Sequence, residues 1–432
     1  MTICLISISV GRKNLPAIRP RGAISRIICV SSASLCENSK KNDNFAELNT
    51  NLFLKPMPVQ IRVVESARDL KTFARFANRL YKGNEYYVPS LIFDDLGTFD
   101  KTRNAAFEFC EAEFYLAYRD GKPVGRVAAI INHKANEAWK VRQVRFGWID
   151  FIDDIDVSSA LLEAVVSFGK ARGMTQVVGP LGFTDFDPEG MLVEGFDRLS
   201  TMALIYNHPY YPEHMKKLGY YKETGWVEYR ITIPERISER HHHIAEAVKE
   251  RYGLRIRKLT RRQIKKENYG RKLFQLINQT YCVLYGYSIL SEKQIDQYVD
   301  LYLSLVDTRM LTFVEDPEGE LIAAGITIPS LSRALQKCNG ELFPFGWWHL
   351  LKAMFLKKPD TLDLLLIGVR PDYQNRGVNS LMFLDLIGTF KKMGFRYAET
   401  NANLETNEKI QAMWRAFDKE LHKRRWVFGK DI

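Results

Sequence analysis

The feature that most constrains the fold is an internal repeat, because the second half of the chain carries the same pattern as the first. Residues 115–130 read YLAYRDGKPVGRVAAI and residues 311–326 read LTFVEDPEGELIAAGI, which predicts two strands joined by a tight turn in each case. Residues 159–174 and 379–395 then carry apolar residues at helical spacing and end at or beside a glycine. The repeat covers a whole domain rather than a short solenoid unit, so it predicts two similar domains.

The order of elements predicted in each half is βααβββαβαβ. In the first half the strands are expected at 59–65, 114–119, 124–131, 146–152, 176–179 and 226–233. In the second half they are expected at 254–258, 311–315, 321–328, 362–367, 397–401 and 425–428. The predicted boundaries are a disordered or spurious extension over 1–56, a first domain over 57–235, a solvated linker over 236–251 and a second domain over 252–432.

A short polar loop, Ile367–Asn379, joins a strand to a helix in the second half and reads IGVRPDYQNRGVN. The free N–H groups of a first helical turn and the positive end of the helix dipole favour a bound phosphate. Gly377 allows the backbone to approach a ligand closely, and Gln374 and Arg376 can add side-chain donors. The loop therefore predicts a phosphate site, although a plain strand-to-helix turn without a ligand is the alternative.

Val369-Arg370-Pro371, followed by Gln374, Arg376 and Gly377, resembles the acyl-CoA pyrophosphate loop of the GCN5-related N-acetyltransferase (GNAT) superfamily. The element order found in both halves resembles the same superfamily, which includes tandem members. The resemblance implies an α/β (α+β) fold with two tandem domains, each a mixed, mostly antiparallel sheet flanked by helices. It also implies acetyl-CoA, or another acyl-CoA, as co-substrate and no metal.

The resemblance further implies which residues contact the cofactor and which carry the chemistry. The backbone N–H of Gly368 or Val369 would polarise the thioester carbonyl, and Glu399 on the fifth strand would be the base. The alternative for Glu399 is a carboxylate paired with neighbouring basic residues. Asn379 stands where the family prefers Gly or Ala, and Trp414 stands where it has a tyrosine acid. The cofactor-binding residues expected are Ile367, Gly368, Val369, Gln374, Asn375, Arg376, Gly377, Val378, Asn379 and Asn407.

The first half lacks the phosphate loop. At the equivalent point, residues 146–159 read FGWIDFIDDIDVSS, and their aspartates would repel a pyrophosphate. The loop that follows, over 179–196, contains four glycines together with Thr184, Asp185, Asp187, Glu189 and Glu194. Clustered carboxylates beside flexible backbone suit a cationic acceptor, so Asp185, Asp187 and Glu189 are predicted to bind a small-molecule or peptide amine. Ordinary turn and cap residues are the alternative.

An insertion over 330–360 has no equivalent in the first half and is rich in aromatic residues, with lysines at its end. It could be a lid, a subunit contact in a homodimer, a membrane-surface element or a helix that packs on the core.

The net charge of +11 suggests an anionic partner. Residues 1–56 contribute eight basic and three acidic residues, a net +5, which leaves +6 for the remainder. That modest excess argues against a dedicated nucleic-acid binder. Six scattered cysteines without metal-ligand spacing fit a reducing compartment, which predicts a cytoplasmic protein, and no apolar run reaches transmembrane length. The early scarcity of acids also leaves an organellar transit peptide open.

The leading functional prediction is an acyl-CoA-dependent N-acyltransferase that transfers an acetyl group to an amine. Two alternatives stay open at this point. One is a transferase that uses aminoacyl-tRNA or a long-chain acyl donor, and the other is a non-catalytic CoA-binding or scaffold protein.

Overall fold

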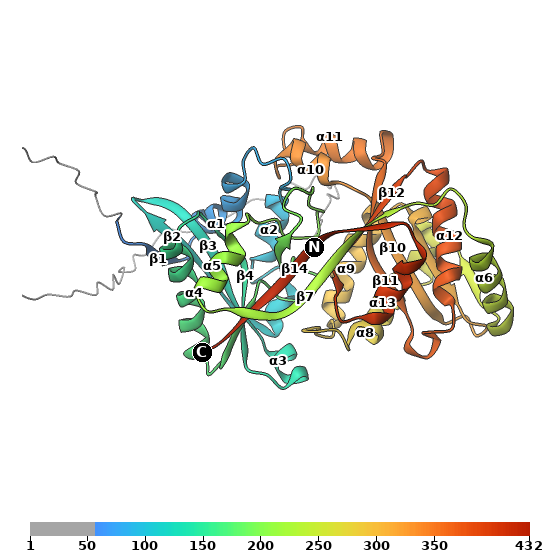
Figure 1. Cartoon of the computed structure of the whole chain (residues 1–432), viewed down its shortest axis with the longest axis horizontal. Helices are drawn as coiled ribbons and strands as arrows, with labels where there is room; N and C mark the ends of the chain where they lie inside the picture. The colour runs from blue at the N-terminus through green and yellow to red at the C-terminus, as the bar shows by residue number, and fades with distance from the viewer. Residues whose placement is uncertain (1–56) are drawn as a thin grey trace, which may run out of the picture. The chain divides into compact units, whose positions relative to one another are not determined.

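The computed structural model describes residues 57–432, so the predicted extension lies outside the described residues. The strands and helices that the sequence predicts occur in the predicted order, with further short elements between them, and the tandem α/β fold is confirmed (Figure 1). The first half contains β1 (Gln60–Val63), α1 (Ala67–Leu80), α2 (Ile92–Thr98), η1 (Ala105–Glu108), β2 (Cys110–Arg119), β3 (Lys122–Asn132), α3 (His133–Trp139), β4 (Gln143–Phe151), α4 (Ile155–Lys170), β5 (Gln176–Gly179), β6 (Met191–Glu194), α5 (Tyr210–Lys217) and β7 (Tyr221–Thr232).

The second half repeats this plan with the insertion added. Its elements are α6 (Glu239–Tyr252), β8 (Arg255–Arg257), α7 (Arg261–Lys266), α8 (Tyr269–Tyr281), α9 (Glu292–Leu305), η2 (Thr308–Met310), β9 (Leu311–Glu315), β10 (Leu321–Pro329), α10 (Ser332–Cys338), α11 (Gly346–Leu351), η3 (Lys352–Leu356), β11 (Thr361–Val369), η4 (Pro371–Tyr373), α12 (Val378–Lys392), β12 (Tyr397–Thr400), β13 (Asn403–Leu404), α13 (Glu408–Met413), η5 (Trp414–Ala416) and β14 (Lys419–Asp431).

The strands of both halves form one continuous mixed sheet. Its order is β1-β2-β3-β4-β5-β14-β7-β12-β11-β10-β9-β8, with β6 paired to β14 and β13 paired to β7. The pairs β4–β5 and β11–β12 are parallel, and the other pairs are antiparallel. The two parallel pairs occupy equivalent places in the two halves, as the repeat requires.

The last strand of each half completes the sheet of the other half, which the sequence did not predict. We expected residues 226–233 to close the first sheet and 425–428 to close the second. Instead β7 pairs with β12, whereas β14 pairs with β5, and the two long strands pair with each other from Lys419↔Ile231 to Gly429↔Tyr221 (Figure 1). Strand residues alternate in burial whichever neighbour they have, so periodicity cannot reveal the exchange.

Helices α4 and α12 follow the parallel strands and pack on the sheet through one apolar face each. Val157, Leu161 and Val165 of α4 are fully buried in the first core. Leu381 and Met382 of α12 are fully or almost fully buried in the second. The apolar spacing that predicted each helix is thus the face that packs.

The segment predicted as a solvated linker over 236–251 contains helix α6. Ala245 and Val248 on this helix are buried against Val378 and Leu381 of α12. Apolar residues three and four apart share a helix face, so Ile244, Ala245 and Val248 form a narrow stripe within an otherwise charged sequence. The boundaries proposed for the two domains stay a prediction.

Candidate functional site

The phosphate-type loop has the strand-loop-helix geometry that its sequence predicts. It leaves β11, passes through η4 and enters α12 at the N-cap residue Gly377. Asn375 and Gly377 both have left-handed backbones, with φ values of 60° and 82°. A Cβ atom at residue 377 would lie 2.9 Å from Val248 Cγ2, so a larger residue would meet both backbone strain and helix α6.

A cavity of about 780 Å³ opens beside this loop, where β11 and β12 separate. The two strands pair only from Thr361↔Tyr397 to Leu364↔Thr400. The pairing of β10 with β11 also skips Leu365, which is a β-bulge at the point of separation. Beyond this point the two chain segments diverge and line the cavity, together with the start of α12 and with α13.

Most residues predicted to bind the cofactor line this cavity. They are Ile367, Gly368, Val369, Gln374, Asn375, Gly377, Val378, Asn379 and Asn407. Arg376 is not among the lining residues, because its exposed guanidinium lies over the rings of Tyr252 and Tyr373. Asn407 uses its Oδ1 to accept a hydrogen bond from the backbone N–H of Ile410, so it caps α13 as well.

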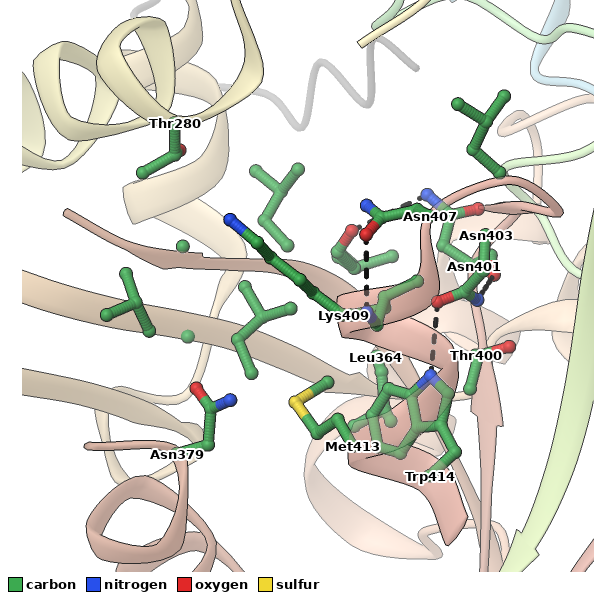
Figure 2. A pocket seen from close by; sticks show the side chains of 18 of the residues that line it. Thr280, Leu364, Asn379, Thr400, Asn401, Asn403, Asn407, Lys409, Met413 and Trp414 are labelled. Atoms are coloured by element: carbon green, nitrogen blue, oxygen red, sulfur yellow. Dashed lines mark hydrogen bonds between the residues drawn. The ribbon is translucent and has the colours of Figure 1, made fainter. Parts of the chain in front are cut away.

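Among the residues that line the cavity, the positive charge beside the loop comes from Lys409, which the sequence analysis missed. Its Nζ donates a 2.8 Å hydrogen bond to Gln374 Oε1, and Gln374 Nε2 in turn donates to the Val369 carbonyl at 3.0 Å. In Figure 2 the Lys409 side chain extends across the cavity, between Thr280 on one side and Asn379 on the other. The only signal in the sequence was its place two residues after Asn407.

The predicted acceptor residues Asp185, Asp187 and Glu189 line the same cavity, although they belong to the first half. Asp187 Oδ2 accepts a hydrogen bond from the Thr184 N–H at 3.0 Å, and Asp185 Oδ2 accepts one from the Ser288 N–H at 3.3 Å. Tertiary folding therefore brings the acidic loop of one half and the phosphate-type loop of the other to one space.

Burial changes the protonation of these carboxyls. It raises the pKa of Asp185 to about 6 and raises the pKa of Glu189 well above its usual value, where the nearby negative charge of Asp185 adds to the effect. Arg145 opposes both shifts, and its guanidinium is held by the carbonyls of Gly182 and Gly286 at 3.2 and 3.0 Å. Carboxyls with raised pKa values can exchange a proton with a bound amine near neutral pH.

The predicted base Glu399 does not line the cavity. Its carboxylate accepts a hydrogen bond from Lys423 Nζ at 3.2 Å, and the same Nζ donates to Glu228 Oε2 at 3.1 Å. Lys423 and Glu228 are fully buried, and Arg425 also donates to Glu228. This geometry favours the alternative, a carboxylate paired with a basic neighbour, and the role of Glu399 as base stays a prediction.

Trp414 is buried and lines the cavity beside Met413 (Figure 2). Its Nε1 donates to Asn403 Oδ1 at 3.1 Å, and its ring packs against Phe383 and Phe417. An indole N–H held in this way cannot serve as the acid that a tyrosine would provide. The wall beside it is apolar and is formed by Ile231, Ile233, Phe383, Leu386, Ile387, Phe390, Met413 and Phe417.

No model of a known protein family matches the chain. The chain has the fold of tandem GNAT proteins. A solved tandem GNAT protein from the clavulanic acid biosynthesis pathway superposes with a TM-score of 0.50 and 11% identity, over 86% of this chain and 98% of its own.

Two known protein sequences are similar over most of the chain. Protein YghO of Escherichia coli (strain K12) is 26% identical over 382 residues, which are 86% of this chain and 95% of that protein. Bacterial ceramide synthase of Caulobacter vibrioides (strain NA1000 / CB15N) is 26% identical over 330 residues, which are 76% of this chain and 83% of that enzyme.

Within residues 57–432, no group of His, Cys, Asp and Glu side chains is arranged to hold a metal ion.

Proposed function

We propose that the protein is an N-acyltransferase that moves an acyl group from CoA to an amine. The observation that carries the proposal is one cavity lined by two unlike groups of residues. The start of α12 and Lys409 suit the pyrophosphate of CoA. Asp185, Asp187 and Glu189 suit a cationic amine.

The reaction follows from this arrangement. An ammonium bound at the acidic loop gives a proton to the ionised carboxylate of Glu189, whose raised pKa makes it a stronger base than an ordinary carboxylate, and the free amine attacks the thioester carbonyl carbon. The new C–N bond forms as the C–S bond breaks, and the nitrogen then loses a second proton, which the departing thiolate of CoA takes up. A backbone N–H at Gly368 or Val369 would stabilise the negative charge on the carbonyl oxygen, since both residues line the cavity where β11 bends.

The proposed acyl group is longer than acetyl. The cavity wall from β7 and α12 to Phe417 is apolar, and a wall of this kind binds a hydrocarbon chain rather than only two carbons. The similarity to an enzyme called a ceramide synthase supports this choice, because a ceramide is the amide of a fatty acid and a long-chain amine. An acetyl donor and a non-catalytic CoA-binding role are the competing outcomes of the experiment.

The test is a calorimetric titration with CoA, followed by assays with acetyl-, octanoyl- and palmitoyl-CoA against short- and long-chain amines. Amide products are measured by mass spectrometry, because the exposed Cys282 thiol would react with a thiol reagent. The matched variant is Asn379→Asp, whose side chain lies in the cavity at the first turn of α12. A carboxylate at a helix N-terminus stabilises the helix, so the fold is retained while phosphate is repelled.

We expect CoA to bind to the wild type and at least tenfold more weakly to Asn379→Asp, a loss of about 1.4 kcal/mol. Absence of CoA binding, or equal binding by both proteins, refutes the proposed site. If CoA binds and no amine in the panel is acylated, the scaffold alternative holds instead. If acetyl-CoA is used better than palmitoyl-CoA, the proposed chain length is wrong.

A further inference from the structure

The insertion between β10 and β11 forms an exposed aromatic surface on the second half. We define the aromatic surface as Phe343, Phe345, Trp347, Trp348, Leu351, Phe355 and Leu356. They are seven of the sixteen large apolar side chains that are exposed within residues 57–300 and 306–432, and they fall within fourteen consecutive residues. Phe345 is 74% exposed, and Leu356 is 67% exposed. A concentration of this kind marks an interaction site rather than scattered surface residues.

The helical segment that carries this surface is apolar on two sides. Gly346, Leu350 and Met354 recur every four residues on the inner side and are buried. Leu350 and Met354 pack on Leu331, Leu335 and neighbouring residues, in a cluster that also contains Leu91 of the first half. Trp347, Leu351 and Phe355 have the same spacing on the outer side, so they form a second stripe that the folded chain leaves exposed.

The charges around the aromatic surface are mostly positive. Residues 332–358 contain Arg333, Lys337, Lys352, Lys357 and Lys358 and one acid, Glu341, a net charge of +4. Glu341 is paired with Arg75 at 2.8 Å. Lys352 and Lys357, at the two ends of η3, are exposed. Exposed tryptophan and phenylalanine side chains beside lysines are the composition of segments that lie in the interface of an anionic membrane.

We propose that the aromatic surface docks the protein on a bilayer that contains anionic lipids. The aromatic side chains enter the boundary between headgroups and acyl chains, and Lys352 and Lys357 contact the lipid phosphates. No helix within residues 57–432 is both long and apolar enough to cross a bilayer, so this attachment is to one face of the membrane.

The position of the surface relative to the cavity fits a substrate that partitions into lipid. Met202 packs against the cluster beneath α11 and also against the core of the second half. The next two residues, Ala203 and Leu204, line the cavity. Docking through the aromatic surface would thus place one cavity wall near the membrane. The docking itself is independent of the proposed reaction.

The test is flotation of the purified full-length chain with vesicles, without any acyl donor, so its failure is separate from failure of CoA binding. Vesicles of phosphatidylcholine alone are compared with vesicles containing 30 mol% phosphatidylglycerol as the probe, at about 0.1 M salt. The apolar variant is Phe345→Ser with Phe355→Ser, and its matched control is Ile155→Ser, an exposed apolar residue on α4. The charge variant is Lys352→Gln with Lys357→Gln.

We expect the wild type and Ile155→Ser to float with the anionic vesicles and much less with the neutral ones. The apolar variant should lose binding by at least tenfold. The charge variant should lose about fivefold for each lysine removed. Absence of flotation, equal binding to both kinds of vesicle, or unchanged binding of either variant overturns the proposal. A wild type that is dimeric by light scattering and becomes monomeric in the apolar variant, without vesicle binding, shows instead that a second copy covers the surface.

Discussion

Replacement of Lys423 by methionine should destabilise the fold strongly. Lys423 is fully buried on β14, one of the two exchanged strands, and its Nζ donates to Glu228 at 3.1 Å and to Glu399 at 3.2 Å. Methionine keeps most of the volume and removes the charge. Removal of one partner from a buried ion pair costs about 3–5 kcal/mol, because the other charge stays buried.

The structure places the expected loss at the lower end of this range, about 3 kcal/mol. In the variant, Glu228 would keep its pairing with Arg425. In the wild type, the charges of Arg425 and Lys423 outweigh the effect of burial and lower the pKa of Glu228 to about 2. Glu399 would lose the donor that the structure shows and is 15% exposed, so water can reach part of its carboxylate. The free energy of unfolding is measured by urea denaturation at pH 7, followed by fluorescence and by circular dichroism.

Lys222→Met is the matched control. Lys222 pairs with Glu405 at 2.5 Å, but the two side chains are 35% and 29% exposed, so the expected loss is about 0–1 kcal/mol. Addition of Glu399→Gln to Lys423→Met should recover part of the stability, since a neutral amide needs no cation. Equal losses for the two lysine variants, or no recovery in the double variant, would refute the buried-pair account. A large loss of activity in Glu399→Gln alone, with unchanged stability, would restore Glu399 as the base.

Three further predictions concern protonation and charge. Burial raises the pKa of Asp363 to about 8, and both its carboxyl oxygens lack a hydrogen-bond partner. Because the carboxyl of the unfolded chain has a pKa of about 4, the free energy of unfolding should fall as the pH rises from about 4 to 8. Asp363→Asn, compared with the wild type by denaturation at pH 5 and pH 8, should therefore be the more stable protein only toward pH 8. Asp185→Asn should move the pH at which acyl transfer rises to a lower value, because the negative charge of Asp185 helps to raise the pKa of Glu189. Glu194→Gln at the end of β6 should leave the profile unchanged. Lys409→Met should weaken CoA about tenfold in calorimetry, a change that Lys392→Met at the far end of α12 should not produce.

The sequence by itself determined the repeated domain plan and the loop from β11 to α12. Both depend on local features, since hydrophobic periodicity fixes strands and helices, and a glycine with positive φ at residue 377 fixes the turn. The same features placed the acidic loop and suggested its carboxylates as one site. The sequence did not predict Lys409 as a residue of the cavity, because a lone lysine at the start of a helix has no distinctive local pattern.

Only the tertiary structure decided how these parts meet. Strand pairing between distant segments is set by packing and register rather than by local propensity, so the exchange of β7 and β14 had no signal in the sequence. The fold brings Asp185 of the first half and Asn379 of the second to one cavity. It also turned Glu399 away from that cavity and toward Lys423, because successive strand residues point to opposite faces of a sheet and Thr400, its neighbour, took the cavity side.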